Sequence, residues 1–217
     1  MRLFAICMLL VVFLVSVSSA ELLTTAMPLG QGKWGVLGAA LQDSNVINNS
    51  GATLASLGGF AGYGITDKLD LFVGLGSSNM NGLAGFSCTV TGIGGTLKYA
   101  LLSEGKNLPV SVAVGVGYKS LSTKATTGDT TGSQIGTAVM ISKVIIPFVP
   151  YGGLTYKKTS TSGTETSTQL DLTLGSAIAW SVQGAVYVEY TLQSINDKTG
   201  IGNYSSGQVG IGVGYAL

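Results

Sequence analysis

Residues 108–123 alternate strictly between apolar side chains and small or polar ones. Valine occupies every second position from 110 to 116, and tyrosine follows at 118. The intervening positions are Ser111, Ala113, Gly115, Gly117 and Lys119. Only a β-strand turns a period of two into two separate faces. The segment therefore predicts a strand with one unbroken apolar face and one small, polar face.

Ten segments of this kind follow one another, each 10 to 13 residues long. Their spans are 33–42, 52–64, 68–78, 91–102, 109–121, 132–144, 147–158, 168–180, 184–194 and 206–217. This length suits a tilted strand that crosses a bilayer. A soluble sandwich would bury the apolar face, but glycine, serine and charged residues hold the other one, so we expect the apolar rows to face lipid.

Lipid cannot satisfy the backbone groups of a free sheet edge, so the strands must close into a ring. We predict an all-β fold, a closed antiparallel up-and-down transmembrane barrel of ten strands, with eight as the alternative if the first or second segment is miscounted. Connections after the even-numbered strands are short. The others are expected to be long polar loops and include the Ser/Thr-rich tracts 122–132 and 159–168. Both termini then lie at the short-turn, periplasmic end.

The positions of the charged residues within the alternating strands support the prediction that the apolar face is turned to lipid. A charge that faces lipid at mid-bilayer costs about 2–4 kcal/mol. Six charged residues fall on the face opposite the apolar rows and are predicted to face the lumen: Asp70, Lys98, Lys119, Lys157, Asp171 and Glu189. Lys143 is the exception, at a strand end where its side chain reaches the headgroups. We predict two cross-strand ion pairs, Asp70–Lys98 and Lys157–Asp171, which either brace the lumen or line a permeation path.

Aromatic residues on the apolar face form two predicted girdles, as in an aromatic belt. One lies near the short turns (Tyr63, Tyr99, Trp180 and Tyr215), and the other near the long loops (Tyr118 and Tyr156). The inward face is rich in glycine, which leaves open a water-filled bore or a flattened barrel whose walls touch. Cys88 is expected in or near the second long loop.

Residues 1–20 have the pattern of a cleaved signal peptide, with Arg2, an apolar stretch and small residues at 18 and 20. Residues 21–217 then form one domain, with ten lysines and ten acids and a net charge of 10 − 10 = 0. Such a chain has no basic surface for nucleic acid. It contains no histidine, so Ser–His chemistry lacks its proton carrier. We expect no catalytic site, no metal site and no cofactor.

Three segments resemble the small outer-membrane barrels of Gram-negative bacteria, the OmpA- and OmpW-like superfamily. They are the hairpin YGITDKLDLFVGLG (63–76), PFVPYGGLTY (147–156) and the closing VGIGVGYAL (209–217). The closing strand is similar to the signal that the barrel-assembly machinery reads, carried here by Val209, Ile211, Val213, Tyr215 and Leu217. The family signal usually ends in Phe, and this chain ends in Leu217.

The resemblance implies an integral outer-membrane protein in contact with lipid and lipopolysaccharide. We expect a non-enzymatic, porin-like barrel that acts as a narrow passive channel for small solutes. The alternative is a structural or adhesin-like barrel that acts through its extracellular loops. A soluble exported β-protein is the third interpretation, and it requires the apolar rows to pack in a closed core.

Overall fold

The structure is a computed structural model that describes residues 25–44, 53–81, 88–105, 108–126, 128–161, 164–181, 183–198 and 202–217. The predicted signal peptide, residues 1–20, lies outside the described residues. Ten strands make up the fold: β1 (Trp34–Ser44), β2 (Thr53–Gly64), β3 (Leu69–Asn81), β4 (Cys88–Leu102), β5 (Ser111–Ala125), β6 (Gly128–Ser142), β7 (Phe148–Thr161), β8 (Thr164–Ala179), β9 (Gly184–Asp197) and β10 (Gly202–Ala216). In the part of the chain that is described, no helix is long and apolar enough to cross a membrane.

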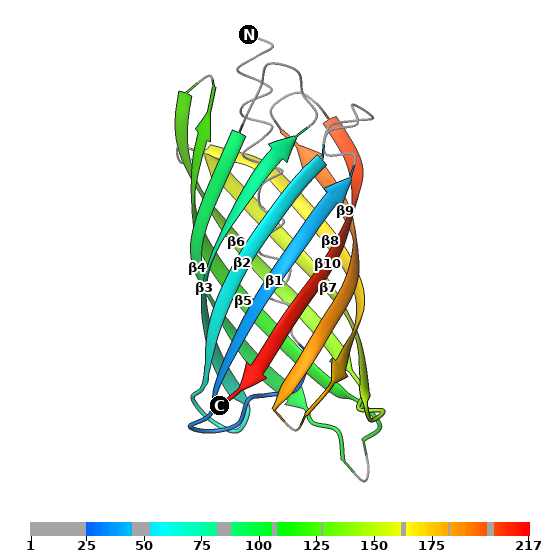
Figure 1. Ribbon diagram of the computed structural model, residues 1–217. Helices are drawn as coiled ribbons and strands as arrows, with labels where there is room; N and C mark the ends of the chain where they lie inside the picture. Colours follow the sequence, from blue (N-terminus) through cyan, green and yellow to red (C-terminus); the bar gives the residue numbers. More distant parts are fainter. Residues whose placement is uncertain are drawn as a thin grey trace.

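Each strand pairs antiparallel with the next one in the chain, and β1 pairs with β10 to close the ring (Figure 1). The closing pair runs from Gly35 opposite Ala216 to Ser44 opposite Gly207. The ten-stranded closed barrel is therefore confirmed, and the eight-stranded alternative is wrong. Closure leaves the barrel with no edge strand, as lipid requires.

The two faces of each strand differ in exposure as the alternation predicts. In β8, Leu170, Leu172 and Leu174 are exposed, whereas Asp171 and Thr173 between them are fully buried. Because the barrel is closed, the buried face is the interior and the apolar rows cover the outer wall. The rows do not pack against one another in a core, which contradicts the soluble interpretation.

The height of the apolar wall matches a bilayer. From Leu170 on β8 to Trp180 directly after its end, both exposed, the chain advances ten residues. This corresponds to about 33 Å along the strand and, at a tilt of about 40°, to about 25 Å along the barrel axis. An apolar band of about 25 Å is typical of outer-membrane barrels.

The strands run further at the loop end than the sequence pattern predicts. The tracts 122–132 and 159–168 were expected as loops, yet Leu121–Ala125 pairs with Gly128–Gly132 and Thr159–Thr161 pairs with Thr164–Ser167. The connections after β5 and β7 thus span only 126–127 and 162–163, so the expectation of long loops there is wrong. The apolar alternation ends where a strand leaves the membrane, but threonine-rich strands keep their hydrogen-bond ladder beyond that point.

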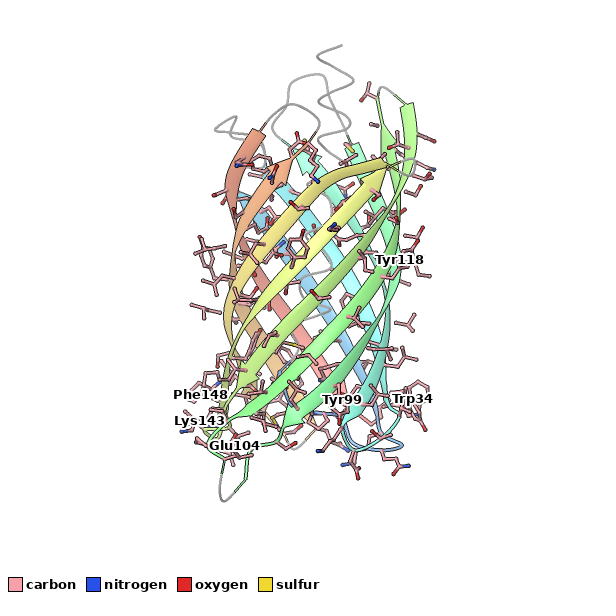
Figure 2. All side chains as sticks on the ribbon, turned by 180° about the vertical axis from the view of Figure 1, so that it is seen from behind. Trp34, Tyr99, Glu104, Tyr118, Lys143 and Phe148 are labelled. Atoms are coloured by element: carbon pink, nitrogen blue, oxygen red, sulfur yellow. The ribbon has the colours of Figure 1, made fainter. Side chains whose placement is uncertain are left out.

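The short-turn end also holds the C-terminus and the described start of the chain (Figure 1). Its turns contact one another, since the Glu104 carboxylate accepts a hydrogen bond from the Val144 N–H at 2.8 Å. The Ile146–Pro147 peptide bond is cis. Lys143 lies just beyond the end of β6 and is exposed, and Figure 2 shows it beside Glu104 and Phe148.

A candidate functional site in the lumen

All six of the charged residues predicted to face inward are buried inside the barrel wall. Asp70, Lys98, Lys119, Lys157, Asp171 and Glu189 are each at most 8% exposed. They come from six different strands, β3, β4, β5, β7, β8 and β9. The lumen, rather than a cleft on the outer surface, is therefore where the structure gathers ionisable groups.

Both predicted ion pairs are present. Lys98 Nζ lies 3.2 Å from Asp70 Oδ2, and Lys157 Nζ lies 2.7 Å from Asp171 Oδ2. Asp70 and Lys98 are directly opposite in the ladder, whereas Asp171 is diagonal to Lys157, which pairs with Gln169. The Gln169 amide donates a further hydrogen bond of 2.7 Å to Asp171. Asp70 and Asp171 therefore each have a cationic partner, without which the desolvation of the carboxylate would be costly.

A third contact joins β7 to β9 across β8, nearer the short-turn end of the barrel than the Lys157–Asp171 pair. The Tyr151 hydroxyl on β7 donates a hydrogen bond of 3.0 Å to Glu189 Oε2 on β9. Gly175 on β8 lies between them, and a Cβ there would collide with the Tyr151 ring. The missing side chain of Gly175 is what allows Tyr151 to lie flat on the wall and reach Glu189.

Other inward glycines are also covered by side chains of a neighbouring strand. A Cβ at Gly62 would meet the ring of Phe72, one at Gly214 would meet Tyr187, and one at Gly210 would meet Leu41 and Glu189. On β4, the Lys119 side chain lies across Gly92 and Gly94. The glycine-rich face thus provides room for large side chains on adjacent strands, rather than an empty bore. The sequence pattern left this question open, because it does not show which side chain covers which glycine.

Two further acids face inward that the sequence analysis assigned to loops. Asp43 on β1 and Asp197 on β9 are 1% and 5% exposed, near the loop end of the barrel. The buried charges of the described residues are therefore three lysines and five acids, a net charge of 3 − 5 = −2. The expected balance of three against three is wrong, because both strands continue past the point where their apolar alternation ends.

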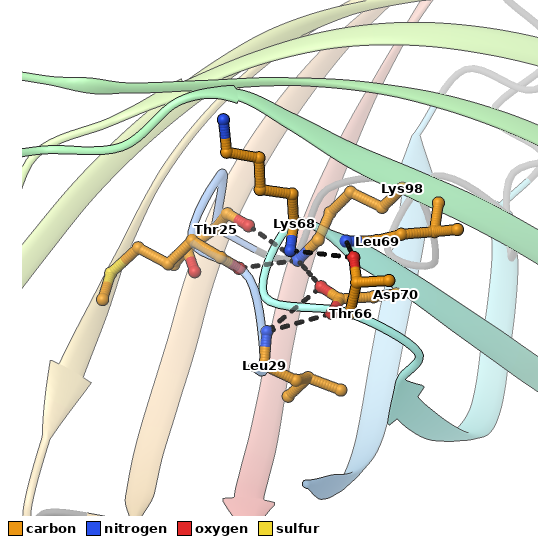
Figure 3. Close-up of polar contacts among 8 residues, drawn as sticks. Thr25, Leu29, Thr66, Lys68, Leu69, Asp70 and Lys98 are labelled. Atoms are coloured by element: carbon orange, nitrogen blue, oxygen red, sulfur yellow. Dashed lines mark hydrogen bonds and ion pairs between the residues drawn. The ribbon is translucent and has the colours of Figure 1, made fainter. Parts of the chain in front are cut away.

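The N-terminal segment, residues 25–32, turns into the mouth of the barrel at the short-turn end and is held there by Asp70 and Lys98 (Figure 3). Both Asp70 oxygens accept the Leu29 N–H at 3.1 Å. Lys98 Nζ donates to the carbonyl oxygens of Met27, at 2.7 Å, and Thr25, at 3.3 Å. With Asp70 as its third acceptor, the ammonium group uses its full hydrogen-bonding capacity.

A close contact between two backbone segments fixes the position at which residues 25–32 lead into β1. Gly30 and Gly32 have φ angles of +91° and +76°, which favour glycine. The Gly32 N–H donates to the Gly64 carbonyl at 2.8 Å, and a Cβ at Gly64 would collide with the Gly30 backbone. No signal in the sequence pattern predicted this contact, since residues 25–32 show no alternation.

A cavity of about 420 Å³ lies beside the segment in the mouth. Met27 and Leu29 line one side of it, and Val149, Ala177 and Tyr187 from the opposite wall line the other. Deeper in the lumen, Thr155 Oγ1, Glu189 Oε1 and Gln193 Nε2 are buried polar atoms with no hydrogen-bond partner among the residues that the structure describes. Buried polar atoms of this kind require water, so the lumen is suited to hold water beside its side chains.

On the outer wall, the residues of the predicted aromatic girdles are exposed. Tyr63, Tyr99, Trp180 and Tyr215 lie near the short turns, and the ring of Trp34 approaches that of Tyr63 to 4.7 Å. Figure 2 shows Trp34, Tyr99 and Phe148 at this end and Tyr118 well above them. Tyr156 is also exposed, and so is Tyr190, an outward residue that the two predicted girdles did not include. The belt function of these residues stays a prediction.

The remaining sequence predictions concern the closing strand and Cys88. Val209, Ile211, Val213, Tyr215 and Leu217 are all exposed, in one row along β10 and the chain end. Cys88, expected in or near the second long loop, is the first residue after that connection: it begins β4, is buried and lies opposite Met80. Among the described residues, no group of three or more His, Cys, Asp or Glu side chains could hold a metal ion.

Comparison with known proteins supports the fold. The sequence matches no protein-family model and no curated protein. Among solved structures, the β domain of the Bordetella autotransporter BrkA matches with a TM-score of 0.52 and 14% identity, over 86% of this chain and 99% of that one.

Two further barrels also match. Neisserial surface protein A has a TM-score of 0.40 and 16% identity, over 84% of this chain and 95% of that one. The N-terminal barrel of Pseudomonas aeruginosa OprF has a TM-score of 0.39 and 12% identity, over 87% and 99%. The closed ring of ten strands and its apolar outer wall, with the match at a TM-score of 0.52, give this protein an outer-membrane β-barrel fold.

Proposed function

We propose that the protein is inserted in the outer membrane of a Gram-negative cell, after cleavage of residues 1–20, and acts there as a narrow passive channel for small ions and solutes. The observation that carries the proposal is the polar lumen. Buried threonine, glutamine and charged side chains line it, and some of their polar atoms need water as a partner. A barrel that served only as an anchor would gain stability from an apolar interior.

The same interior offers little for catalysis. The sequence has no histidine, so a serine nucleophile would need a lysine as its base. Lys98 and Lys157 are both held in ion pairs with carboxylates at 3.2 Å or less. We therefore propose a non-enzymatic role.

Conductance in a planar bilayer tests the channel directly. The mature chain, refolded and inserted from detergent, should produce discrete current steps that are small for a barrel of this size, because the N-terminal segment occupies part of the mouth. Parallel samples should show the heat-dependent shift in gel mobility of a folded barrel. Folded protein in a silent bilayer would contradict the proposal.

The channel should prefer cations, since the buried charges of the described residues sum to −2. Reversal potentials in a KCl gradient measure this preference. Glu189→Lys changes the sum to 4 − 4 = 0 and should remove most of the selectivity. Tyr151→Phe is the matched control, because it deletes the hydrogen bond to Glu189 and keeps the charge. Anion preference in the unmodified protein would overturn the charge argument.

A second function, contact with a surface partner, is supported by the two ribbons at the loop end. The β5–β6 and β7–β8 hairpins carry paired, polar strand tips in place of loops, and the β5–β6 hairpin extends beyond neighbouring strands in Figure 1. If the folded protein conducts no ions, these tips become the best candidate for its activity.

A further inference from the structure

We infer that residues 25–32 are a releasable stopper, and that the Asp70–Lys98 pair is the clamp that keeps this segment in the mouth and so sets the size limit of the pathway. The inference rests on the proposed channel function, because a size limit has meaning only where solutes pass. A stopper role for residues 25–32 is required neither by the alternation of the strands nor by the barrel fold.

The clamp recognises backbone rather than side chains. Asp70 accepts the Leu29 N–H with both oxygens, and Lys98 donates to two carbonyl oxygens of the same segment. Both clamp residues belong to the barrel wall, on β3 and β4. Each of these groups forms equally good hydrogen bonds with water once the segment leaves, so the net stabilisation by each bond is modest.

The contacts of the described residues place the segment against the part of the wall formed by β1 to β6. Ala26 is fully buried in a cluster with Ala113 on β5 and Met140 on β6. The opposite wall, with Val149, Ala177 and Tyr187, faces the segment across the cavity of about 420 Å³. The segment therefore narrows the mouth and does not fill it, and its release would merge its own volume with the cavity.

Release does not require the barrel to unfold. The ten strands form a continuous ladder of backbone hydrogen bonds, whereas the segment adds no strand to that ladder before Trp34. Elements that depend on a few polar contacts open at a lower free energy than the ladder itself. The two glycines with positive φ, Gly30 and Gly32, lie at the end of the segment next to β1 and are suited to serve as its hinge.

The first test measures release without reference to conduction. Ala26→Cys is introduced together with Cys88→Ser, and the rate of modification by a membrane-impermeant maleimide is measured in refolded protein. Leu29→Pro removes the N–H that Asp70 accepts and leaves the barrel wall unchanged. Leu29→Ala is the matched control, since it loses the same side chain and keeps the N–H.

The buried thiol should react slowly in the control and about tenfold faster or more with Leu29→Pro, a factor that corresponds to about 1.4 kcal/mol. Asp70→Asn should accelerate the reaction in the same direction, provided that gel mobility shows a folded barrel. Equal rates for Leu29→Pro and Leu29→Ala would overturn the clamp. Rapid labelling without any change at residue 29 would overturn the stopper.

The second test separates the stopper from the proposed function. If the channel is real, Leu29→Pro should raise the single-channel conductance several-fold relative to Leu29→Ala. Faster labelling with a silent bilayer in both variants would uphold the stopper and contradict the channel. Faster labelling with equal, measurable conductance would show that the segment moves but does not limit the pathway, which contradicts the inference.

Discussion

Lys157→Met should lower the free energy of unfolding by about 3–5 kcal/mol, because it leaves the Asp171 carboxylate buried without its cation. The Lys157 ammonium lies 2.7 Å from that carboxylate, and the two side chains are 1% and 0% exposed. A neutral hydrogen-bond donor such as the Gln169 amide does not replace a full charge. Urea titration of protein refolded into phospholipid vesicles measures the loss.

Two control experiments test whether water is excluded from the Lys157–Asp171 ion pair, as the burial of both side chains implies. Lys158→Met makes the same change one residue further, on the exposed face of β7, and should cost less than about 1 kcal/mol. Lys157→Met combined with Asp171→Leu should recover most of the loss, since an apolar pair of similar size needs no desolvation. If the substitutions at 157 and 158 cost the same, water reaches the pair and the lumen is wider at this level than the contacts indicate.

Leu174→Arg should cost about 2–4 kcal/mol, because its side chain faces lipid near the middle of the apolar band. Leu174 is 62% exposed and lies near the midpoint between Leu170 and Trp180 on the outer face of β8. Leu101→Arg places the same charge near the short-turn end, where the cost should fall to about 0–1 kcal/mol. Unfolding from vesicles measures both.

The decisive result is whether the loss in free energy of unfolding caused by arginine depends on the depth of the residue in the apolar band. Leu174→Ala provides the baseline, since it removes apolar contact without adding a charge. A similar cost for arginine at 174 and at 101 would mean that the outer wall does not span a hydrocarbon layer. In that case the apolar rows would need another partner, and the membrane orientation on which the channel depends would be wrong.

The sequence alone was sufficient to predict the ten strands, their facing and both ion pairs. Each of these follows from local rules: successive side chains point to opposite faces, and lipid excludes charge from one of them. Asp70 and Lys98 could be paired from sequence because they lie near the short-turn ends of two consecutive antiparallel strands and so face each other at the same level. Strand limits at the loop end were missed, since the outer face is polar beyond the apolar band and the apolar alternation therefore stops before the strands do.

Only the tertiary structure decided what fills the barrel. Tyr151 reaches Glu189 across Gly175, and Lys119 covers Gly92 and Gly94, through the register of strands that the sequence pattern does not encode. The N-terminal segment enters the mouth through backbone groups, which every residue carries and which leave no mark on composition or periodicity. The lipid acts on each outward residue separately, so the outer wall can be read from the sequence; the lumen is shared by all ten strands, so its contents depend on how the ring closes.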